Sequence, residues 1–291
     1  MSNTITPRPS HGKASVSPPA RRALCEHLDD VIGRMQHDLD SAASLVAQAV
    51  GEVGGQVGGQ VAVDEVELTV VIPVYNEPVT VLEIVDRVRA LPISKQVVVV
   101  DDGSTDGTTQ ALEQLSGLPD VVVLKHTVNR GKGAALQTGF EYAQGRFVIV
   151  QDADLEYNPQ DILRVIAPLQ AGQSDVVYGS RYLDNAKQDP SWLHRLGNWG
   201  LTTFSNLLTG HRLTDMETCY KAFRRDLLQQ IRIEQDRFGF EPEITAKLAH
   251  RGVAIREVGI SYACRSREEG KKIGWRDLIN ALYCIVRYRF F

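Results

Sequence analysis

The sequence predicts an α/β fold, with a mostly parallel sheet covered by helices on both faces. Beyond residue 65, short apolar segments rich in β-branched residues alternate with segments of helical periodicity, as in successive strand–helix–strand units. The apolar segments are also nearly continuous, and residues 97–100 are all valine. Such strands are typical of a sheet whose two faces are both buried.

The alternation places five strands and four helices along the chain. The strands are expected at residues 66–74, 96–100, 121–124, 147–150 and 175–178. The helices are expected between them, at residues 81–91, 108–115, 132–143 and 160–169. Ligands of open α/β sheets bind beyond the carboxyl ends of the strands, so functional residues are expected directly after each strand.

Residues 1–65 differ in composition and are expected to form an appendage. The first nineteen residues hold four of the twelve prolines, which predicts disorder. Apolar residues then recur at steps of three or four between residues 21 and 50, which predicts one amphipathic helix. The glycine-rich residues 51–60 are typical of a flexible linker. The helix is expected to self-associate or to pack on the main domain rather than to bind a specific partner.

Composition and charge exclude several classes of protein. The formal net charge of −4 gives no reason to expect nucleic acid as a partner. The sequence contains no run of eighteen apolar residues, so no membrane span is predicted. Residues 1–13 lack the apolar centre of a signal peptide. The four cysteines show neither metal-site nor disulfide spacing, which favours free thiols in a reducing compartment. A cytoplasmic location is therefore expected.

A polar cluster follows each of the five predicted strands. The clusters are Pro73-Val-Tyr-Asn-Glu77, Asp101-Asp-Gly-Ser-Thr-Asp-Gly107, Asn129-Arg-Gly-Lys-Gly133, Gln151-Asp-Ala-Asp-Leu-Glu156 and Gly179-Ser-Arg181. Each one alone is compatible with a turn or a helix cap. Five clusters at the same edge of one sheet favour a binding site.

The cluster after the fourth strand predicts a metal site. Residues i and i+2 of an extended segment point the same way, so Asp152 and Asp154 are expected to face one point, with Glu156 as a third ligand. Their hard oxygens favour Mg²⁺ or Mn²⁺, which complete their coordination shells with phosphate oxygens. The alternative is an acidic turn that caps the helix beginning near Pro159.

The glycine-rich cluster around Lys132 suggests phosphate binding at a helix start, but it matches neither common template. Leu136 takes the place of the third glycine of the dinucleotide fingerprint, and no Gly-Lys-Ser/Thr sequence of a P-loop is present. Both observations disfavour a dinucleotide-dependent oxidoreductase and an ATPase. Asp101 and Asp102 would suit a ribose or a base edge, so the edge as a whole predicts a nucleoside diphosphate bound through a metal.

In their order along the chain, these motifs resemble those of family 2 glycosyltransferases. Three later segments, at residues 215–221, 238–241 and 268–273, are similar to the polyprenyl-phosphate branch typified by dolichol-phosphate mannose synthase. The resemblance spans residues 66–275 and leaves residues 276–291 as a C-terminal amphipathic helix. It implies a GT-A fold, a nucleotide-sugar donor and a divalent cation.

The resemblance also implies roles for individual residues. Nucleotide-sugar binding is implied for Pro73, Tyr75, Glu77, Asp102, Lys132 and Asp152. Metal binding is implied for Asp152, Asp154 and Glu156, where a mannose synthase is expected to have Gln in place of Glu156. Catalytic roles are implied for Asp154, Asp215, Glu217 and Lys221, the last two beside the sugar. Cys219 stands where a small residue, usually glycine, is expected, which puts the shape of the sugar pocket in question.

The acceptor decides whether the reaction needs a general base. A hydroxyl must lose a proton, and Asp215 or Glu217 would have to accept it. A phosphate monoester, with a second pKa near 6, is already an oxyanion at pH 7. Such an acceptor needs only positioning by cations, and Arg181, Arg195, Lys271 and Lys272 would supply them.

Three functional hypotheses follow. The leading one is an inverting transferase that moves mannose or glucose, from GDP-mannose or UDP-glucose, onto polyprenyl phosphate with Mg²⁺ or Mn²⁺. The second is a soluble glycosyltransferase that acts on a sugar or small-molecule hydroxyl. The third is a catalytically inactive regulatory protein that binds a nucleotide sugar.

A lipid acceptor implies contact with the inner face of the cytoplasmic membrane. Seven basic and three acidic residues lie between Arg265 and Phe291, interleaved with aromatic and aliphatic residues. A basic amphipathic helix with aromatic residues is typical of a peripheral membrane protein. Trp192, Leu196, Trp199 and Phe204 predict a second such helix near Arg195. The alternative for the C-terminal helix is that it only packs on the domain.

Overall fold

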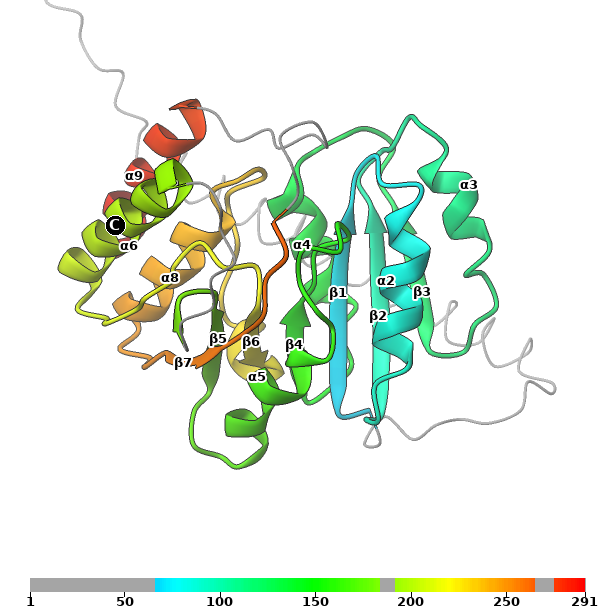
Figure 1. The fold of residues 1–291 in the computed structure, drawn as a ribbon, viewed down its shortest axis with the longest axis horizontal. Coiled ribbons are helices and arrows are strands. Elements are labelled where there is room, and N and C mark those ends of the chain that lie inside the picture. The colour runs from blue at the N-terminus through cyan, green and yellow to red at the C-terminus, as the bar shows by residue number, and fades with distance from the viewer. Residues whose placement is uncertain (1–65, 184–191, 265–274, 291) are drawn as a thin grey trace, which may run out of the picture. The chain divides into compact units, whose positions relative to one another are not determined.

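The computed structural model describes residues 66–183, 192–264 and 275–290, and in these ranges it describes all side chains except those of residues 192–194 and 275–277. A seven-stranded sheet with the order β3-β2-β1-β4-β6-β5-β7 lies at the centre (Figure 1). The strands are β1 (Leu68–Val74), β2 (Lys95–Asp101), β3 (Val121–Lys125), β4 (Phe147–Val150), β5 (Val176–Ser180), β6 (Lys221–Arg224) and β7 (Arg256–Gly259). Only β6 runs antiparallel to its neighbours, so the predicted mostly parallel sheet is confirmed.

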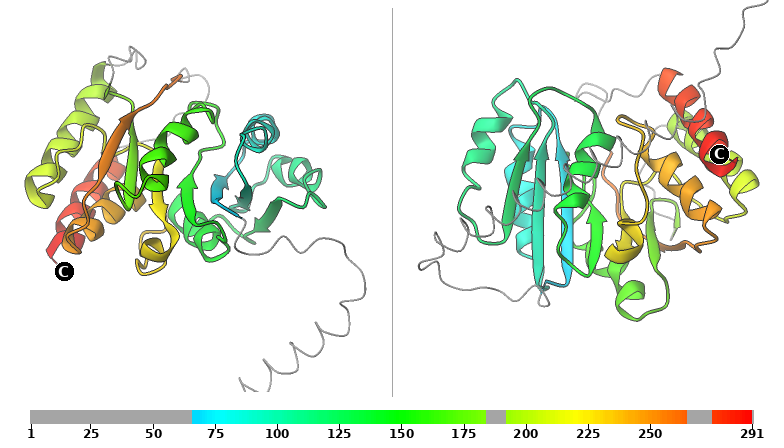
Figure 2. Two further views of the ribbon diagram at one scale, coloured as in Figure 1. Left: turned by 90° about the horizontal axis from the view of Figure 1, so that it is seen from below. Right: turned by 180° about the vertical axis from the view of Figure 1, so that it is seen from behind.

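Helices cover both faces of the sheet, as predicted. They are α2 (Thr80–Arg89), α3 (Thr108–Glu113), α4 (Lys132–Glu141), α5 (Asp161–Gln170), α6 (Trp192–Thr209), α7 (Arg225–Leu228), α8 (Phe240–His250) and α9 (Trp275–Phe290). In Figures 1 and 2, α2 and α5 lie on one face, and α4 and α8 lie on the other. Helices α6 and α9 pack against each other and against α8.

The central strands form the core of the domain. All four residues of β4 and all five of β5 are buried, and β1 is buried at every position except Pro73. Helix α4 packs closely on β1, because a Cβ at Gly139 would lie only 2.3 Å from a methyl group of Val71. This rigid sheet positions the loops at its carboxyl edge.

The predicted elements are found close to their expected limits, and the additional ones lie after residue 190. The first predicted strand starts two residues late, at Leu68, and the fifth extends to Ser180. Strands β6 and β7 were not predicted, because each has four residues and includes charged side chains, as in the sequence Arg-Glu-Val-Gly. Neither has the continuous apolar sequence by which β4, a strand of the same length, was predicted.

The termini differ in what the structure describes. The predicted N-terminal tail, helix and linker at residues 1–65 lie outside the described residues. A C-terminal helix is present as α9. None of the helices in the described ranges combines the length and the apolarity needed to cross a bilayer. Cys219 and Cys284 are free thiols, as expected for them.

Candidate active site

The loops after β1 and β2 are joined at the carboxyl edge of the sheet. Asn76 has a φ of 57°, its backbone N–H donates to Ser104 Oγ (3.0 Å), and its side-chain oxygen accepts from Thr105 N (2.9 Å). These bonds fix the loop that carries Tyr75, whose side chain is exposed. An exposed ring on a fixed loop can stack on a ligand.

Two other residues predicted to hold the nucleoside flank Tyr75. Pro73 belongs to β1 and lies opposite Val100 of β2. Glu77 leads into α2, where its Oε2 accepts a hydrogen bond from Thr80 Oγ1 (2.8 Å). The structure brings these residues to one edge, and their contact with a nucleoside stays a prediction.

Asp102 connects two loops inside the protein. It is buried, and its Oδ1 lies 2.7 Å from His126 Nδ1. The carboxylate also accepts hydrogen bonds from the backbone N–H groups of Arg130 (2.9 Å) and Gly131 (2.6 Å). It therefore holds the glycine-rich loop before α4, a role that the sequence did not indicate. Its predicted contact with the nucleoside stays untested.

Helix α4 begins close to the segment that precedes α8. A Cβ at Gly133 would lie 1.8 Å from the carbonyl oxygen of Gln235, so this approach requires glycine. Lys132 Nζ thereby lies 2.9 Å from Asp152 Oδ1 and 2.9 Å from Glu241 Oε1. Burial alone would lower the pKa of Lys132, but the two carboxylates outweigh it and raise that pKa well above its usual value.

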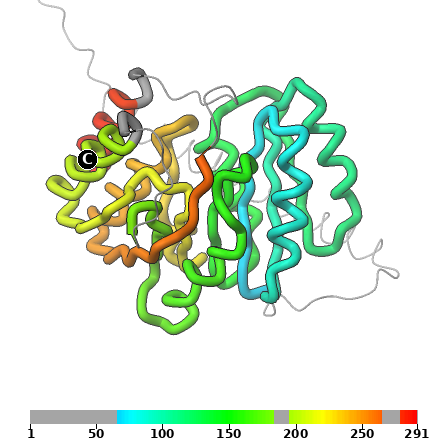
Figure 3. Tube along the Cα trace, in the orientation of Figure 1, coloured from blue at the N-terminus to red at the C-terminus, as the bar shows by residue number. Residues whose placement is uncertain are grey.

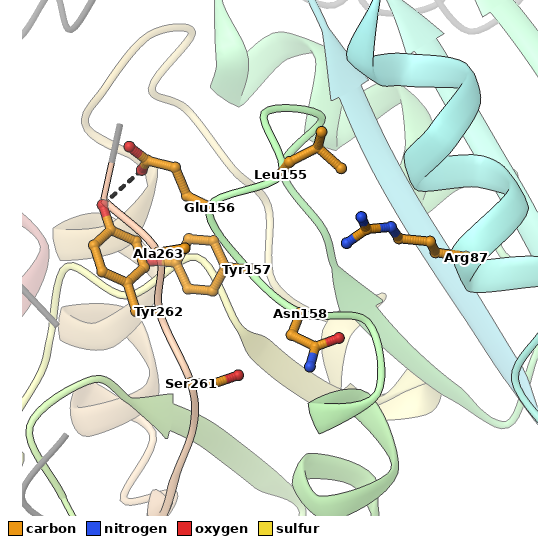
Figure 4. Close-up of a pocket in the computed structure, with 8 residues that line it drawn as sticks. All are labelled: Arg87, Leu155, Glu156, Tyr157, Asn158, Ser261, Tyr262 and Ala263. Carbon is orange, nitrogen blue, oxygen red and sulfur yellow. Dashed lines mark hydrogen bonds between the residues drawn. The ribbon is translucent and has the colours of Figure 1, made fainter. Parts of the chain in front are cut away.

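The loop after β4 carries the three predicted metal ligands, but it is not extended. Residues 153 and 154 form a turn, and Leu155 has a φ of 60°. Asp154 Oδ1 accepts a hydrogen bond from Glu156 N (3.1 Å), and Glu156 Oε2 accepts one from Tyr262 Oη (2.6 Å) (Figure 4). The expectation of an extended segment, on which the common direction of these side chains depended, is therefore wrong.

A metal ion nevertheless fits the chemistry of this loop. In the part of the chain that the structure describes, no three acidic, histidine or cysteine side chains form a preassembled site. Asp152 and Asp154 still offer the carboxylate oxygens that Mg²⁺ and Mn²⁺ prefer, whereas Glu156 is held by Tyr262. The metal site remains a prediction, best supported for the two aspartates.

The chain after β7 runs beside the acidic loop (Figure 3), and Tyr157 and Tyr262 form an isolated antiparallel bridge there. A cavity of about 380 Å³ lies between the two segments and Arg87 of α2 (Figure 4). Its lining residues are Arg87, Leu155, Glu156, Tyr157, Asn158, Ser261, Tyr262 and Ala263. Of the predicted site residues that the structure describes, only Glu156 lines this cavity.

Arg181, directly after β5, forms a two-pronged ion pair with Asp215. Nε lies 2.7 Å from Oδ2, and Nη2 lies 2.8 Å from Oδ1. The Arg181 guanidinium also lies 5.1 Å from the centre of the Tyr262 ring, which places it beside the acidic loop. Burial opposes the charge of Arg181, but Asp215 outweighs this effect and raises the arginine pKa well above its usual value. Arg181 is thus a fixed cation whose side chain is 15% exposed.

Lys221 is fully buried, and the charge of the half-buried Glu217 acts on it. The Lys221 ammonium donates to the carbonyl oxygens of Met216 (2.8 Å) and Thr218 and lies 4.5 Å from the centre of the Tyr178 ring. Burial lowers the pKa of Lys221 to about 8 and raises that of Glu217 to about 7. Glu217 Oε1 has no hydrogen-bond partner among the described residues. Their predicted place beside the sugar stays a prediction.

Cys219 joins this segment to the acidic loop. It is buried, and its backbone N–H donates to Tyr157 Oη (3.0 Å). Burial, together with the charge of Asp152 and a hydrogen bond to it, raises the pKa of Cys219 well above its usual value. The thiol that replaces the expected glycine therefore lies against a predicted metal ligand.

Of the remaining predicted acceptor cations, the structure describes only Arg195. Arg195 is exposed on α6. Lys271 and Lys272 lie outside the described residues. Of the two predicted cations among the described residues, Arg181 is held in an ion pair with Asp215 and Arg195 is exposed.

Several residues of the site were not singled out from the sequence. Glu241, which shares Lys132 with Asp152, belongs to the Phe-Gly-Phe-Glu motif, and its position in that motif was the available signal. Tyr262 and Glu257 lie near the end of the domain in segments without a motif. Only the folded chain shows that Tyr262 contacts the loop after β4 and that Glu257 contacts the segment between α6 and β6.

The mostly parallel sheet, the glycine-opened helix and the acidic and basic loops at one edge define an α/β protein with a candidate ligand site at the carboxyl ends of its strands. Residues 69–232 match the sequence profile of glycosyl transferase family 2, more than half of the chain. The chain belongs to this family.

Named relatives support an enzyme. The chain is 31% identical to polyprenol monophosphomannose synthase of Mycolicibacterium smegmatis, over 70% of this chain and 80% of that protein. It is 32% identical to undecaprenyl-phosphate mannosyltransferase of Micrococcus luteus, over 70% and 86%. It is also 32% identical to an undecaprenyl-phosphate 4-deoxy-4-formamido-L-arabinose transferase of Aeromonas hydrophila, over 75% of this chain and 66% of that protein.

Solved structures confirm the fold. Mannosyl-3-phosphoglycerate synthase of Rubrobacter xylanophilus superposes with a TM-score of 0.58 at 22% identity, over 77% of this chain and 72% of that chain. Glucosyl-3-phosphoglycerate synthase of Mycobacterium tuberculosis superposes with a TM-score of 0.60 at 19% identity, over 79% and 85%. The chain is a glycosyltransferase with the predicted GT-A fold.

Proposed function

We propose that this glycosyltransferase moves a hexosyl group from a nucleotide sugar to polyprenyl phosphate. The names of the bacterial relatives at about one-third identity support a polyprenyl-phosphate acceptor. The observation that carries the proposal is the Arg181–Asp215 pair, which fixes a cation after β5 beside the acidic loop.

A fixed arginine suits an acceptor that is already an anion. The acceptor phosphate is largely ionised at pH 7, so its oxygen attacks the anomeric carbon of the donor without a general base. The bond between that carbon and the diphosphate breaks as the new bond forms, with inversion. The guanidinium of Arg181 offers five N–H donors, of which Asp215 engages two, and the others are proposed to orient the phosphate.

The leaving nucleoside diphosphate gains negative charge during transfer. Asp152 and Asp154 are proposed to hold Mg²⁺ or Mn²⁺, which when bound would neutralise that charge. Lys132 is proposed to meet the same diphosphate, since its ammonium already lies at Asp152. Tyr75, Pro73 and Glu77 are proposed to contact the nucleoside.

The donor is proposed to be GDP-mannose or UDP-glucose. Mannose is the first sugar to test, because two of the relatives are named for its transfer. Cys219 narrows the space near Asp152 relative to glycine, and Glu217 and Lys221 are proposed to border the sugar.

A lipid acceptor requires contact with a membrane surface, and we place this contact on α6 and α9 at the cytoplasmic face. Both helices expose large apolar side chains, namely Leu196, Trp199, Leu207, Leu278, Ile279, Leu282, Tyr283, Val286 and Phe290. On α9 these residues lie on the face opposite the buried Ala281, Cys284, Ile285 and Tyr288. Arg287 and Arg289 are interleaved with them, as in interfacial helices.

The test is transfer by the purified full chain with Mg²⁺ or Mn²⁺, a panel of radiolabelled nucleotide sugars and a short polyprenyl phosphate. Formation of a glycolipid from one donor is expected. Transfer to water-soluble acceptors alone would overturn the polyprenyl-phosphate proposal. Binding of the nucleotide sugar without turnover would instead support a regulatory protein.

One observation favours a second candidate, transfer to a hydroxyl group. The pKa of Glu217 is raised to about 7, and its Oε1 has no hydrogen-bond partner among the described residues, as suits a general base. Glu217→Gln separates the two candidates. If Glu217 is a general base, the substitution should lower kcat roughly 100-fold or more. If the acceptor is a phosphate, the substitution should change kcat much less.

A further inference from the structure

We propose that Glu257 of β7 is a positioning residue for the acceptor step. It fixes the Thr214–Asp215 backbone and thereby the ion pair between Asp215 and Arg181. The proposal rests on the proposed function only for the identity of the group that Arg181 meets, an acceptor phosphate.

The Glu257 carboxylate receives hydrogen bonds from two consecutive residues. Thr214 N donates to Oε1 (3.0 Å) and Oε2 (2.8 Å), and Thr214 Oγ1 donates to Oε2 (3.1 Å). Asp215 N donates to Oε1 (3.0 Å). Both oxygens of the carboxylate are therefore used, and a glutamine amide offers only one such acceptor.

Glu257 is held by the sheet rather than by a loop. In the parallel pairing of β5 with β7 it lies opposite Tyr178, and Ser180 lies opposite Gly259. Ser180 Oγ is 2.6 Å from Thr214 Oγ1. The end of β5, where Arg181 follows, is thus tied to the same threonine that Glu257 holds.

The contacts of Asp215 show what this arrangement positions. The side chain is fully buried and accepts hydrogen bonds from Arg181 N (3.1 Å), Nε (2.7 Å) and Nη2 (2.8 Å) and from Asn198 Nδ2 (3.2 Å). A carboxylate has about four lone-pair sites, and all of them are occupied. Asp215 therefore has no free site for a substrate proton, and its role is to hold Arg181.

The arrangement is electrostatically unfavourable for Glu257. Burial raises the pKa of Glu257, hydrogen bonds from Thr214 and Asp215 oppose the rise, and the negative charge of Asp215 adds to it, so that the net shift is upward. Stability alone does not explain why a second carboxylate, that of Glu257, is held against the backbone of Asp215. A fixed arginine at the carboxyl edge of the sheet does explain it.

The first experiment observes Arg181 without any substrate. In ¹⁵N-arginine-labelled full chain, the Nε–H resonance that disappears in Arg181→Lys reports on the Nε–Oδ2 hydrogen bond. Its exchange with solvent is expected to be at least tenfold faster in Glu257→Gln than in the wild type. An unchanged exchange rate would overturn the proposal. If Glu257→Gln does not fold, Thr214→Val replaces it, because this variant loses the hydroxyl contacts with Glu257 and Ser180 but keeps both backbone N–H donors to Glu257. The exchange rate must then show a smaller rise, and an unchanged rate would again overturn the proposal.

The second experiment measures kinetics with a short polyprenyl phosphate. Glu257→Gln is expected to raise the acceptor KM about tenfold and to leave the donor KM within twofold. The matched control is Arg256→Gln, because Arg256 is the neighbouring residue on β7 and its exposed side chain bonds only Gln173 among the described residues. Equal changes in both KM values, or the same effect in the control, would indicate a merely structural role. If the wild type does not use polyprenyl phosphate, the proposed function fails while the exchange measurement still tests Glu257.

Discussion

The ammonium group of Lys132 lies 2.9 Å from the Asp152 carboxylate at the end of β4. The pair joins the start of α4 to the acidic loop, and Glu241 of α8 shares the same ammonium at 2.9 Å. Two carboxylates at one edge of the sheet are thereby compensated by a residue of the chain itself. Because a diphosphate offers Lys132 the same kind of oxygen as Asp152 does, we propose that the pair connects the stability of the site with donor binding.

Replacing Lys132 by methionine is expected to destabilise the fold. The substitution leaves Asp152 and Glu241 partly buried without their shared partner, a change that costs 3–5 kcal/mol for fully buried pairs. Since the side chains retain 17% and 22% exposure at Lys132 and Asp152, we expect a loss of about 2 kcal/mol in urea unfolding. Lys125→Met, at the exposed end of β3, is the matched control, and equal losses in both variants would contradict this reasoning.

Asp154→Asn is expected to abolish metal-dependent turnover and to preserve the fold. An amide is neutral and a weaker ligand for Mg²⁺, so the loss of charge stabilisation should lower kcat by roughly 100-fold or more. Turnover is measured across a Mg²⁺ titration, with thermal unfolding as a check on the fold. Asp175→Asn changes an exposed aspartate paired with Arg224 and should behave as wild type. Full activity of Asp154→Asn at saturating Mg²⁺ would remove the metal proposal.

Sequence reasoning succeeded where the signal is local. The strands and helices up to residue 180 follow from apolar periodicity, and the polar loops follow from the rule that sites lie at the carboxyl ends of strands. It failed where the contact is between distant segments. Glu257 lies 42 residues from Asp215, whose backbone it holds, and no pattern near either residue predicts their contact.

The acidic loop illustrates a second kind of failure. The argument that Asp152, Asp154 and Glu156 share a direction assumed an extended chain, but Leu155 adopts a left-handed conformation. Such a φ is uncommon outside glycine, so residue preferences do not predict it. Tyr262, more than one hundred residues away, then binds Glu156.

Glu217 is expected to make stability depend on pH. Its pKa is raised by burial to about 7 in the folded chain and lies near 4.3 in an unfolded chain. The folded state therefore binds more protons between these values, and the free energy of unfolding falls as pH rises from about 5 to about 7.

Glu217→Gln mimics the protonated side chain and removes this dependence. Relative to wild type, the variant should gain about 2 kcal/mol in unfolding free energy between pH 5 and pH 7.5. Urea unfolding at both pH values measures the difference. The opposite outcome is that the variant has a lower free energy of unfolding than wild type at pH 7.5 and the same dependence of that free energy on pH. This result would show that Glu217 is charged and well paired in the fold.

The exposed apolar face of α9 is expected to bind lipid. Ile279 and Leu282 are 55% and 37% exposed, whereas Cys284 and Ile285 bury the opposite face. Substitution of the exposed pair tests the membrane contact more cleanly than deletion of the helix, because deletion would also remove the buried face. In the double variant Ile279→Asn/Leu282→Asn, the affinity for vesicles of phosphatidylglycerol and phosphatidylcholine at low salt should fall roughly 25-fold, about 1 kcal/mol for each partly exposed side chain.

The control is Val128→Asn, which removes an apolar side chain that is 63% exposed after β3 and should bind vesicles as wild type does. Equal binding of all three proteins, with unfolding free energies unchanged, would mean that α9 only packs on the domain.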